Sequence, residues 1–139
     1  MKFVLDTNVF LKALIKNSTV RGIIMGSNHE FLVPAHLIDE TREHLDEVEE
    51  KSGLSRSEIE SVLDALLGRT RFVEEGQVLS RWREAEKAMN KVDENDVPFV
   101  AAALAARCDG IWSDDRHLKR QSKVRVWTTR EVVRLGGRA

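Results

Sequence analysis

Residues 96–115 read DVPFVAAALAARCDGIWSDD and decide the fold. The segment from Val97 to Arg107 is almost wholly apolar, which predicts the most buried helix of the molecule. Pro98 stands near the start of this segment, where its missing N–H costs little. Residues 110–113 predict a short strand that runs directly into two aspartates. A buried helix followed by a buried strand is typical of folds in which helices cover a parallel sheet.

The same pairing of an apolar strand with a carboxylate opens the chain. Residues 2–5 predict a buried strand that ends at Asp6, and helical spacing of apolar residues follows from Val9 to about Lys16. A second short helix is expected from Val20 to Met25, before Gly26. In chain order, the remaining predicted elements are a strand at 31–33 ended by Pro34, helices at 36–50 and 55–67, an edge strand at 71–73, a loop at 74–77, a helix at 80–89, a strand at 124–127 and a helix from Thr128 to 136–137.

Local signals mark the ends of two of these helices. Ser55 and Glu58 form a capping-box pattern at one start, Gly68 marks the end of that helix, and Thr128 is expected to cap the last one. There is no internal repeat and no segment long enough to link two domains. Strands that alternate with helices therefore predict the α/β class, as a three-layer α/β/α sandwich around a central, mainly parallel sheet, in a single domain over residues 1–139.

The composition narrows the class of protein. The 22 Lys and Arg residues against 23 Asp and Glu leave a net charge of −1, which excludes a general polycationic coat for nucleic acid but allows a local basic rim. The single cysteine, Cys108, cannot form an intramolecular disulfide, so a secreted disulfide scaffold is excluded. The start of the chain lacks the apolar region of a signal peptide, and no apolar run reaches about 18 residues. We expect a cytoplasmic protein with no membrane partner.

Carboxylates follow two of the predicted strands. Asp6 comes after the first strand, and Asp114 and Asp115 come after the strand at 110–113. Parallel sheets bind ligands beyond the carboxyl ends of their strands, so these acids stand where sites in α/β proteins usually lie. Asp96 begins the buried helix, where it acts either as a plain N-cap or as part of a site.

Considered together, the acids indicate a metal site. Glu40 adds a fourth carboxylate from the charged helix at 36–50. If Asp6, Glu40, Asp96 and Asp115 converge, each pair at about 5 Å repels by about 3 kcal/mol at an effective dielectric of 20. A divalent cation offsets that repulsion, and a site built of oxygen ligands suits Mg²⁺ or Mn²⁺. Such ions activate water and neutralise charge on phosphate, which points to phosphodiester chemistry.

Four segments of the sequence resemble those of a known protein family: FVLDTNVFLKAL (3–14), PAHLIDETREHL (34–45), DENDVPFVAAALAARCDGIWSDDRHL (93–118) and VRVWTTREVV (124–133). With them the chain resembles the PIN-domain ribonucleases over nearly its whole length, and in particular the small stand-alone toxins of that family. The resemblance implies a metal-dependent endoribonuclease with Mg²⁺ or Mn²⁺ as its cofactor. The family's acids fall on four positions, all of them expected to be catalytic and three of them (Asp6, Asp96 and Asp115) assigned to the metal; the fourth is Glu40.

The chain departs from the family at one point. Where many members have Thr-Gly-Asp, this sequence has Ser113-Asp114-Asp115, so Ser113 takes the place of the hydroxyl and it stays open which aspartate reaches the metal. Further residues are accessory candidates. Glu43 is a reserve for Glu40, and Asp93 is either an accessory ligand or a solvated loop acid. Thr7 and Asn8 either hydrogen-bond to Asp6 or a metal-bound water, or simply begin a helix.

Other residues near these acids allow further interpretations, which have less support. His36 and His44 flank Glu40 at a spacing of four residues, but no H-E-x-x-H motif or cysteine cluster supports a zinc site. His117 either contacts phosphate or, as we favour, is a surface histidine beside Arg116. The basic residues of 116–125 form either an RNA-steering rim or a solvated turn, and Trp82, Trp112 and Trp127 are expected in the core or an interface.

Two other functions are excluded, because the chain lacks the acids that they need at the required positions. An aspartyl phosphatase needs a second acid two residues after the first, where this chain has Asn8. A phosphoacceptor receiver needs its acids in the reverse order. A non-catalytic binding module on the same fold is the runner-up. The resemblance implies an RNA substrate, an antitoxin protein as partner if the chain is a toxin, and a homodimer; RNA processing or quality control is the alternative role.

Overall fold

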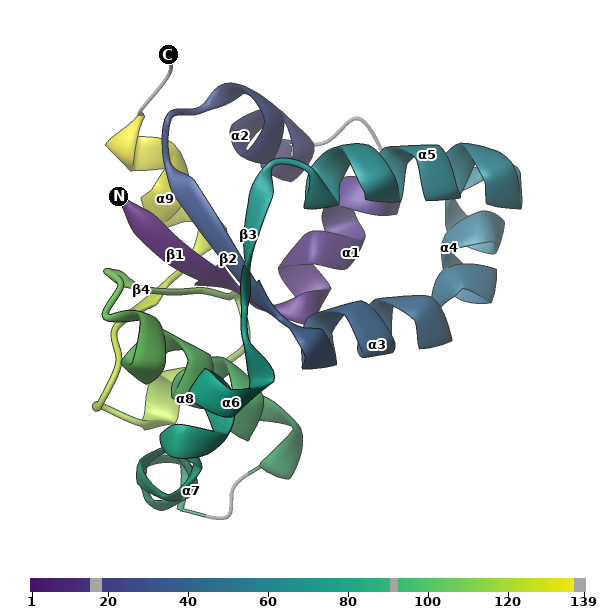
Figure 1. Cartoon of the computed structure of the whole chain (residues 1–139). Helices are drawn as coiled ribbons and strands as arrows, with labels where there is room; N and C mark the ends of the chain where they lie inside the picture. The colour runs from purple at the N-terminus through teal and green to yellow at the C-terminus, as the bar shows by residue number, and fades with distance from the viewer. Residues whose placement is uncertain (16–18, 91–92, 137–139) are drawn as a thin grey trace.

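The computed structural model describes residues 1–15, 19–90 and 93–136 (Figure 1). Its centre is a five-stranded sheet with the order β3-β2-β1-β4-β5, and each pairing between the described strands is parallel. The predicted parallel sheet is confirmed, and so is the edge position of the strand near residue 72. The strands are β1 (Lys2–Leu5), β2 (Glu30–Pro34), β3 (Thr70–Val73), β4 (Gly110–Trp112) and β5 (Val126–Trp127).

Helices cover both faces of this sheet, as the predicted three-layer sandwich requires (Figure 1). Crossovers between parallel strands are right-handed, so the connections from β1 to β2 and from β2 to β3 leave their helices on one face. The return from β3 to β4 puts its helices on the other face. The first group is α1 (Thr7–Ile15), α2 (Thr19–Gly26), α3 (Ala35–Glu43), α4 (Leu45–Ser52) and α5 (Arg56–Leu67); the second is α6 (Glu75–Ser80), α7 (Trp82–Met89) and α8 (Val97–Ala106).

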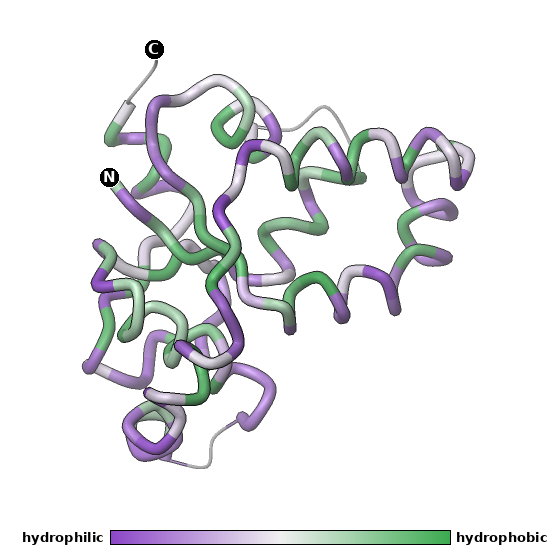
Figure 2. The backbone as a smooth tube through the Cα atoms, in the orientation of Figure 1, coloured by the Kyte–Doolittle hydropathy of each residue, from purple (hydrophilic) through white to green (hydrophobic). Residues whose placement is uncertain are grey.

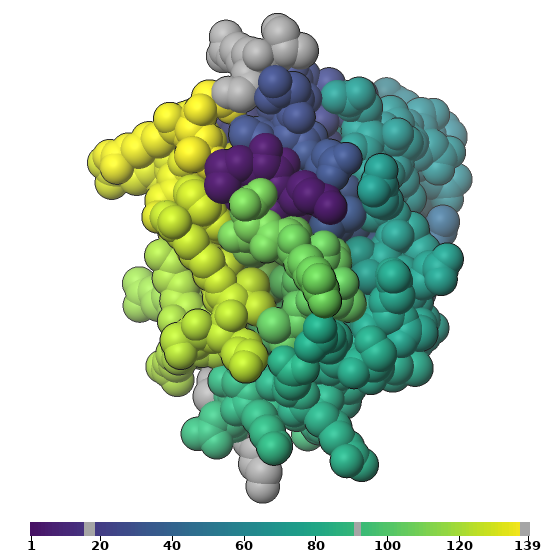
Figure 3. Space-filling model, turned by 60° about the vertical axis from the view of Figure 1, so that its left-hand side comes forward, coloured from purple at the N-terminus to yellow at the C-terminus, as the bar shows by residue number. Residues whose placement is uncertain are grey.

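Three short elements complete the chain. Single 3₁₀ turns, η1 (Glu94–Asp96) and η2 (Leu118–Arg120), precede α8 and follow β4, and α9 (Thr129–Leu135) follows β5. The helix α9 lies beside α2, with which it lines a shallow cavity of about 480 Å³. Both ends of the described chain meet there, because the ring of His29 accepts a hydrogen bond from the Met1 amino group at 2.9 Å and donates one to the Gly136 carbonyl at 3.1 Å. Figure 3 shows the start of β1 at the surface beside the C-terminal segment.

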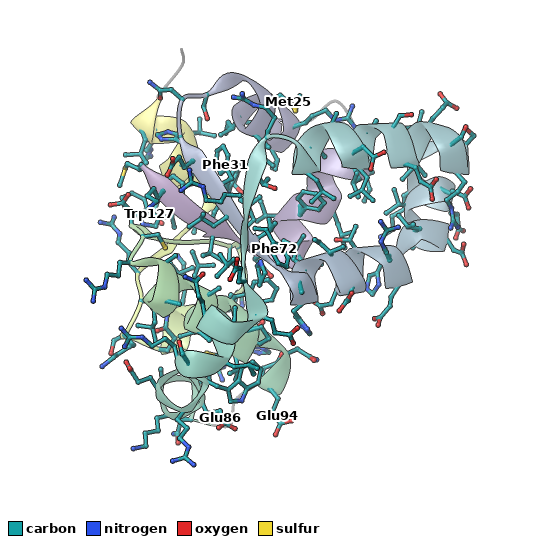
Figure 4. All side chains as sticks on the ribbon, viewed as in Figure 1. Met25, Phe31, Phe72, Glu86, Glu94 and Trp127 are labelled. Atoms are coloured by element: carbon teal, nitrogen blue, oxygen red, sulfur yellow. The ribbon has the colours of Figure 1, made fainter. Side chains whose placement is uncertain are left out.

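The core follows the strands and α8. Hydrophobic residues concentrate in the strands, whereas the tips of α4 and α5 are largely hydrophilic (Figure 2). The helix α8 is buried from Val97 to Ala103, which confirms it as the most buried helix among those described. Phe31 packs inside against Trp112, with ring centres 5.9 Å apart, while Glu86 and Glu94 point outward (Figure 4). Of the tryptophans, Trp112 and Trp127 are buried, and Trp82 is half-buried beside a small cavity of about 160 Å³.

The start of β4 depends on a glycine. Gly110 has a φ of +148°, and a Cβ atom there would overlap the carbonyl oxygen of Arg125 and lie 2.9 Å from ring atoms of Trp127. The absence of a side chain lets the indole of Trp127 lie directly on the strand, where its Nε1 donates a hydrogen bond to the Asp109 carbonyl at 3.0 Å. Arg125 stacks over the same ring, with its guanidinium carbon 3.6 Å from the ring centre. This packing fixes β5 against β4.

The predicted caps are confirmed. The Ser55 side chain and the Glu58 side chain form a reciprocal capping box at the start of α5, and Gly68 ends that helix. Thr128 and Glu131 form a second capping box at the start of α9. These local signals are readable in sequence because they need only residues three positions apart.

The prediction of one helix over 36–50 is wrong. The chain breaks at His44 into α3 and α4, without a proline or glycine at the break. Both helices pack against α1, and α4 turns sharply away from α3 around it (Figure 1). Burial of Leu45 and Val48 in this turned position stabilises the bend. Apolar spacing alone cannot reveal such a break, because the period is continuous through it.

Other boundaries also differ from those expected. The predicted loop at 74–77 begins α6, and the helix predicted at 80–89 is divided at Arg81, because α6 and α7 each pack on α8. The last strand starts at Val126 instead of 124, because the side chain of Gln121 makes hydrogen bonds to both the N–H and the carbonyl of Val124 and holds it in a turn. The expected helix ends at Lys16 and at residue 137 lie outside the described residues. Within the described ranges, no helix is long and apolar enough to cross a membrane.

Candidate active site

The order of the strands reverses direction between β1 and β4. From β1 the chain builds the sheet in one direction through β2 and β3, and then returns to add β4 on the other side. The crevice at such a reversal, beyond the carboxyl ends of the strands, is where open α/β sheets bind ligands. Asp6 follows β1, and residues 113–115 follow β4. The topology therefore brings the two strand-end acids together across the sequence.

Asp6 is buried in this crevice, with 4% of its surface exposed. Its backbone N–H donates to the Trp112 carbonyl at 3.1 Å, and its own carbonyl accepts the first hydrogen bond of α1. Its Oδ2 accepts a hydrogen bond from the hydroxyl of Ser113 at 2.7 Å. The pKa of Asp6 is raised to about 6: burial is the largest cause, repulsion from Asp115 and Glu40 adds to it, and the Ser113 hydrogen bond opposes it.

Ser113 joins the two strand ends. Its side chain is fully buried, and its hydroxyl accepts the backbone N–H of Asp115 at 3.0 Å while donating to Asp6. One hydroxyl thus fixes the orientation of one carboxylate and the backbone of the next. This is the position at which the sequence resemblance expected a hydroxyl.

Asp96 has an unusual environment for an acid. It is 6% exposed, its Oδ2 is buried and has no hydrogen-bond partner among the described residues, and its side chain makes no cap bond to α8. The reading of Asp96 as a plain N-cap therefore has no hydrogen bond to support it. Burial raises the pKa of Asp96 to about 7, with repulsion from Asp115, Asp93, Asp6 and Glu40 as further causes.

Glu40 reaches the same group from α3. Its Oε1 accepts a hydrogen bond from the Thr7 hydroxyl at 2.6 Å, so the Thr7 side chain orients Glu40. The Thr7 backbone N–H hydrogen-bonds to the Asp6 carboxylate and lowers its pKa, as one of the two expectations for Thr7 required. His36 Nε2 lies 3.3 Å from the same oxygen but is not aligned for a hydrogen bond. Because Glu40 contributes to the raised pKa of both Asp6 and Asp96, its charge lies close enough to act on both aspartates.

The two adjacent aspartates face different ways. Asp114 accepts the backbone N–H and the hydroxyl of Thr129 at 2.8 Å and 2.6 Å, and it lies 3.3 Å from Lys12 Nζ. Burial opposes ionisation of Asp114, but these hydrogen bonds prevail and lower its pKa. Asp115 is half-buried and instead contributes repulsion to Asp6 and Asp96. The structure thus turns Asp115 toward the other acids and Asp114 toward α9.

The remaining candidate residues lie at the edge of the group of acids. Glu43 and Asn8 are exposed, and Asp93 accepts the Asn95 N–H at 2.9 Å at the start of η1. Beside Asp115 a groove of about 750 Å³ opens between α1 and α4, and Asn8 and Arg116 are among its lining residues. The predicted basic rim is divided, because only Arg116 of its residues lines this groove, whereas Lys123 lies 3.9 Å from Glu84 and Arg125 stacks on Trp127.

The residues present fit a hard divalent cation. Asp6, Asp96 and Asp115 offer oxygen ligands, and the partnerless Oδ2 of Asp96 is a buried acceptor without a donor. The raised pKa values of Asp6 and Asp96 show that the metal-free site disfavours their charges. An oxygen-rich set of this kind suits Mg²⁺ or Mn²⁺ better than zinc.

One neighbour of the acids was not expected as part of the site. Among the described residues, ligand atoms of Asp93, Asp96 and His117 lie within 4.8 Å of one another. The sequence prediction favoured His117 as an ordinary surface histidine. The available signal was its place two residues after Asp115, which sets it on the same loop as the predicted site.

The chain matches the family model described as PIN domain over residues 4–135. The chain belongs to the PIN domain family. No curated protein matches this PIN domain in sequence. Among solved structures it is similar to the crystal structure of VapBC2 from Rickettsia felis bound to a DNA fragment from their promoter, with a TM-score of 0.70 and 14% identity over 92% of this chain and 98% of that one. The expected family and fold are therefore confirmed.

Proposed function

We propose that this PIN domain is an endoribonuclease that depends on Mg²⁺ or Mn²⁺ and cleaves single-stranded RNA. The observation that carries the proposal is the gathering of four acids at the crevice between β1 and β4, with Asp96 Oδ2 buried and partnerless. Membership of the PIN domain family supports it.

The roles of the residues follow from their contacts. Asp6, Asp96 and Asp115 would hold the cation, which would neutralise charge on the phosphate and lower the pKa of water. Ser113 keeps Asp6 and the backbone of Asp115 in place. Thr7 occupies Oε1 of Glu40, so we assign Oε2 to accept a proton from the attacking water. The groove beside Asp115 gives the RNA strand its approach, with Arg116 at its edge.

We assign the biological role of toxin, neutralised by an antitoxin protein. This assignment is supported by the resemblance to small stand-alone PIN toxins and by the likeness in fold to VapBC2. Co-expression with the product of a neighbouring gene for a small DNA-binding protein tests it: a stable complex without cleavage activity is expected. Activity unaffected by every such neighbour would favour RNA processing. Light scattering on the purified chain tests the predicted homodimer.

The nuclease activity itself is tested with a labelled single-stranded RNA. We expect cleavage with Mg²⁺ or Mn²⁺, none in EDTA, and a loss of at least about 100-fold in rate for Asp96→Asn, the scale of removing an electrostatic catalytic group. Asp114→Asn is the matched control, because Asp114 lies beside Asp115 in sequence but bonds to Thr129. Full cleavage in EDTA, or equal rates for the two variants, would contradict the proposal.

A further inference from the structure

A histidine ring lies next to two of the acids. The ligand atoms of Asp93, Asp96 and His117 are all within 4.8 Å of one another, although they come from the turn before α8, the start of α8 and the loop after β4. Within the described residues, His117 is the one histidine that joins two acids at this separation. The arrangement brings a nitrogen donor to a group of oxygen donors.

A second observation points to a ligand at this place. The Oδ2 atom of Asp96 is buried and has no hydrogen-bond partner among the described residues, and Asp96 as a whole is 94% buried. A buried acceptor without a donor costs about 1–3 kcal/mol, more when it is charged, unless a ligand meets it. Asp96 is therefore a buried acceptor that a bound cation would complete.

The loop holds His117 in position without using up its ring. The backbone N–H of His117 donates to Asp115 Oδ1 at 2.8 Å, which closes a tight turn at 115–117. The ring Nδ1 lies 3.9 Å from the same oxygen, too far for a hydrogen bond. The side chain is 50% exposed, so a metal ion from solvent can reach it.

We propose that His117 supplies a nitrogen ligand to the divalent metal held at Asp96, and that this makes the site select Mn²⁺ over Mg²⁺. The inference rests on the proposed metal-dependent function. Mg²⁺ demands oxygen ligands in nearly ideal octahedral geometry and keeps its waters. Mn²⁺ also favours oxygen ligands, but as a first-row transition ion it accepts an imidazole nitrogen beside them more readily than Mg²⁺ does. A ring nitrogen among carboxylates therefore adds affinity for Mn²⁺ and little for Mg²⁺.

Pulsed electron paramagnetic resonance tests this without any cleavage assay. The full chain, free of affinity tag and stripped with chelator, is loaded with MnCl₂ below stoichiometry. We expect a ¹⁴N coupling from a directly bound nitrogen, absent in His117→Asn. The control is His44→Asn, because His44 lies in the turn between α3 and α4, outside the group of His117.

Titrations give the second readout. His117→Asn should weaken Mn²⁺ binding at least about tenfold, the lower end of losses on disturbing metal sites, and change Mg²⁺ binding by less than about twofold. His44→Asn should leave both affinities unchanged. Absence of the ¹⁴N signal in the wild type, its persistence in His117→Asn, or equal loss of both metals would overturn the proposal. A variant that binds Mn²⁺ normally but binds single-stranded RNA less tightly would instead make His117 a phosphate contact.

The outcome separates this proposal from the nuclease proposal. Manganese bound through nitrogen by a protein that fails to cleave RNA would uphold the ligand and reject the nuclease. Metal-dependent cleavage without nitrogen coupling would uphold the nuclease and reject His117 as a ligand.

Discussion

Replacing Asp96 with asparagine should stabilise the metal-free protein. The carboxylate is 6% exposed, and burial together with its acidic neighbours raises its pKa to about 7. Asparagine has nearly the same volume and cannot ionise. The Asp96 side chain makes no cap bond that the substitution would remove. The amide group of the new asparagine lies close to carboxylates that can accept its hydrogen bonds.

The size of the effect depends on pH. The folded protein holds the Asp96 proton up to about pH 7, whereas an unfolded chain releases it near pH 3.8, so wild-type stability falls as the pH rises between these values. A difference of about three pKa units at about 1.4 kcal/mol each sets an upper limit of about 4 kcal/mol above pH 7. Allowing for relaxation and water at the site, we expect about 2–4 kcal/mol, which is roughly 7–14 °C in melting temperature.

Thermal melts in EDTA at pH 4.5, 6 and 8 measure this. The Asp96→Asn variant should melt close to wild type at pH 4.5 and well above it at pH 8. Asp114→Asn is the control of opposite sign: its pKa is lowered in the folded protein, so its charge stabilises above pH 4 and its loss should lower the melting temperature at pH 8. If Asp96→Asn melted below wild type at pH 8, or if the gap did not grow with pH, the crowded metal-free site would be refuted.

Three further predictions follow from the same geometry. Asp115→Asn should slow single-turnover RNA cleavage by at least about 100-fold, while Asp114→Gly keeps most activity and melts lower; the reverse ranking in rate would contradict the orientations described. Calorimetry should show Mg²⁺ binding weaken from pH 8 to pH 5.5, because the two buried aspartates, with pKa values of about 6 and about 7, take up protons that the metal must displace; equal affinity would count against them as ligands. Gly110→Ala should lower the free energy of unfolding, measured in urea, by about 2–4 kcal/mol, because its Cβ overlaps a backbone carbonyl oxygen. Gly76→Ala, at a position in α6 with open space around it, should raise the free energy of unfolding by about 0.5–1 kcal/mol. Similar values for both variants would be inconsistent with this packing.

Sequence reasoning reached the parts of the fold that local or repeating signals encode. The strand-end positions of Asp6 and Asp115 follow from apolar runs that stop at a carboxylate, and the capping boxes need only residues three apart. The break at His44 was out of reach, because it arises from packing of α3 and α4 against α1 and leaves no proline or glycine in the chain. The early turn at Gln121 likewise depends on side-chain hydrogen bonds that no periodicity reveals.

The candidate site, too, has features that the sequence could predict and features that it could not. The convergence of the acids follows from topology, but the choice between Asp114 and Asp115 depends on Thr129, which lies 15 residues away and captures Asp114. Thr7 was expected to hydrogen-bond to Asp6, and its backbone does, but its hydroxyl also orients Glu40, because the side chain at the start of α1 points toward α3. The closeness of His117 to Asp93 and Asp96 depends on how the loop after β4 meets η1, a long-range contact that sequence spacing does not determine.

Anomalous scattering from a crystal of the chain soaked in MnCl₂ tests the central claim most directly. The account predicts a strong manganese peak in the crevice between β1 and β4, in contact with the carboxylates of Asp6, Asp96 and Asp115, and no peak there in the Asp96→Asn variant. Manganese found only at other surface acids, with these three carboxylates unliganded, would contradict it.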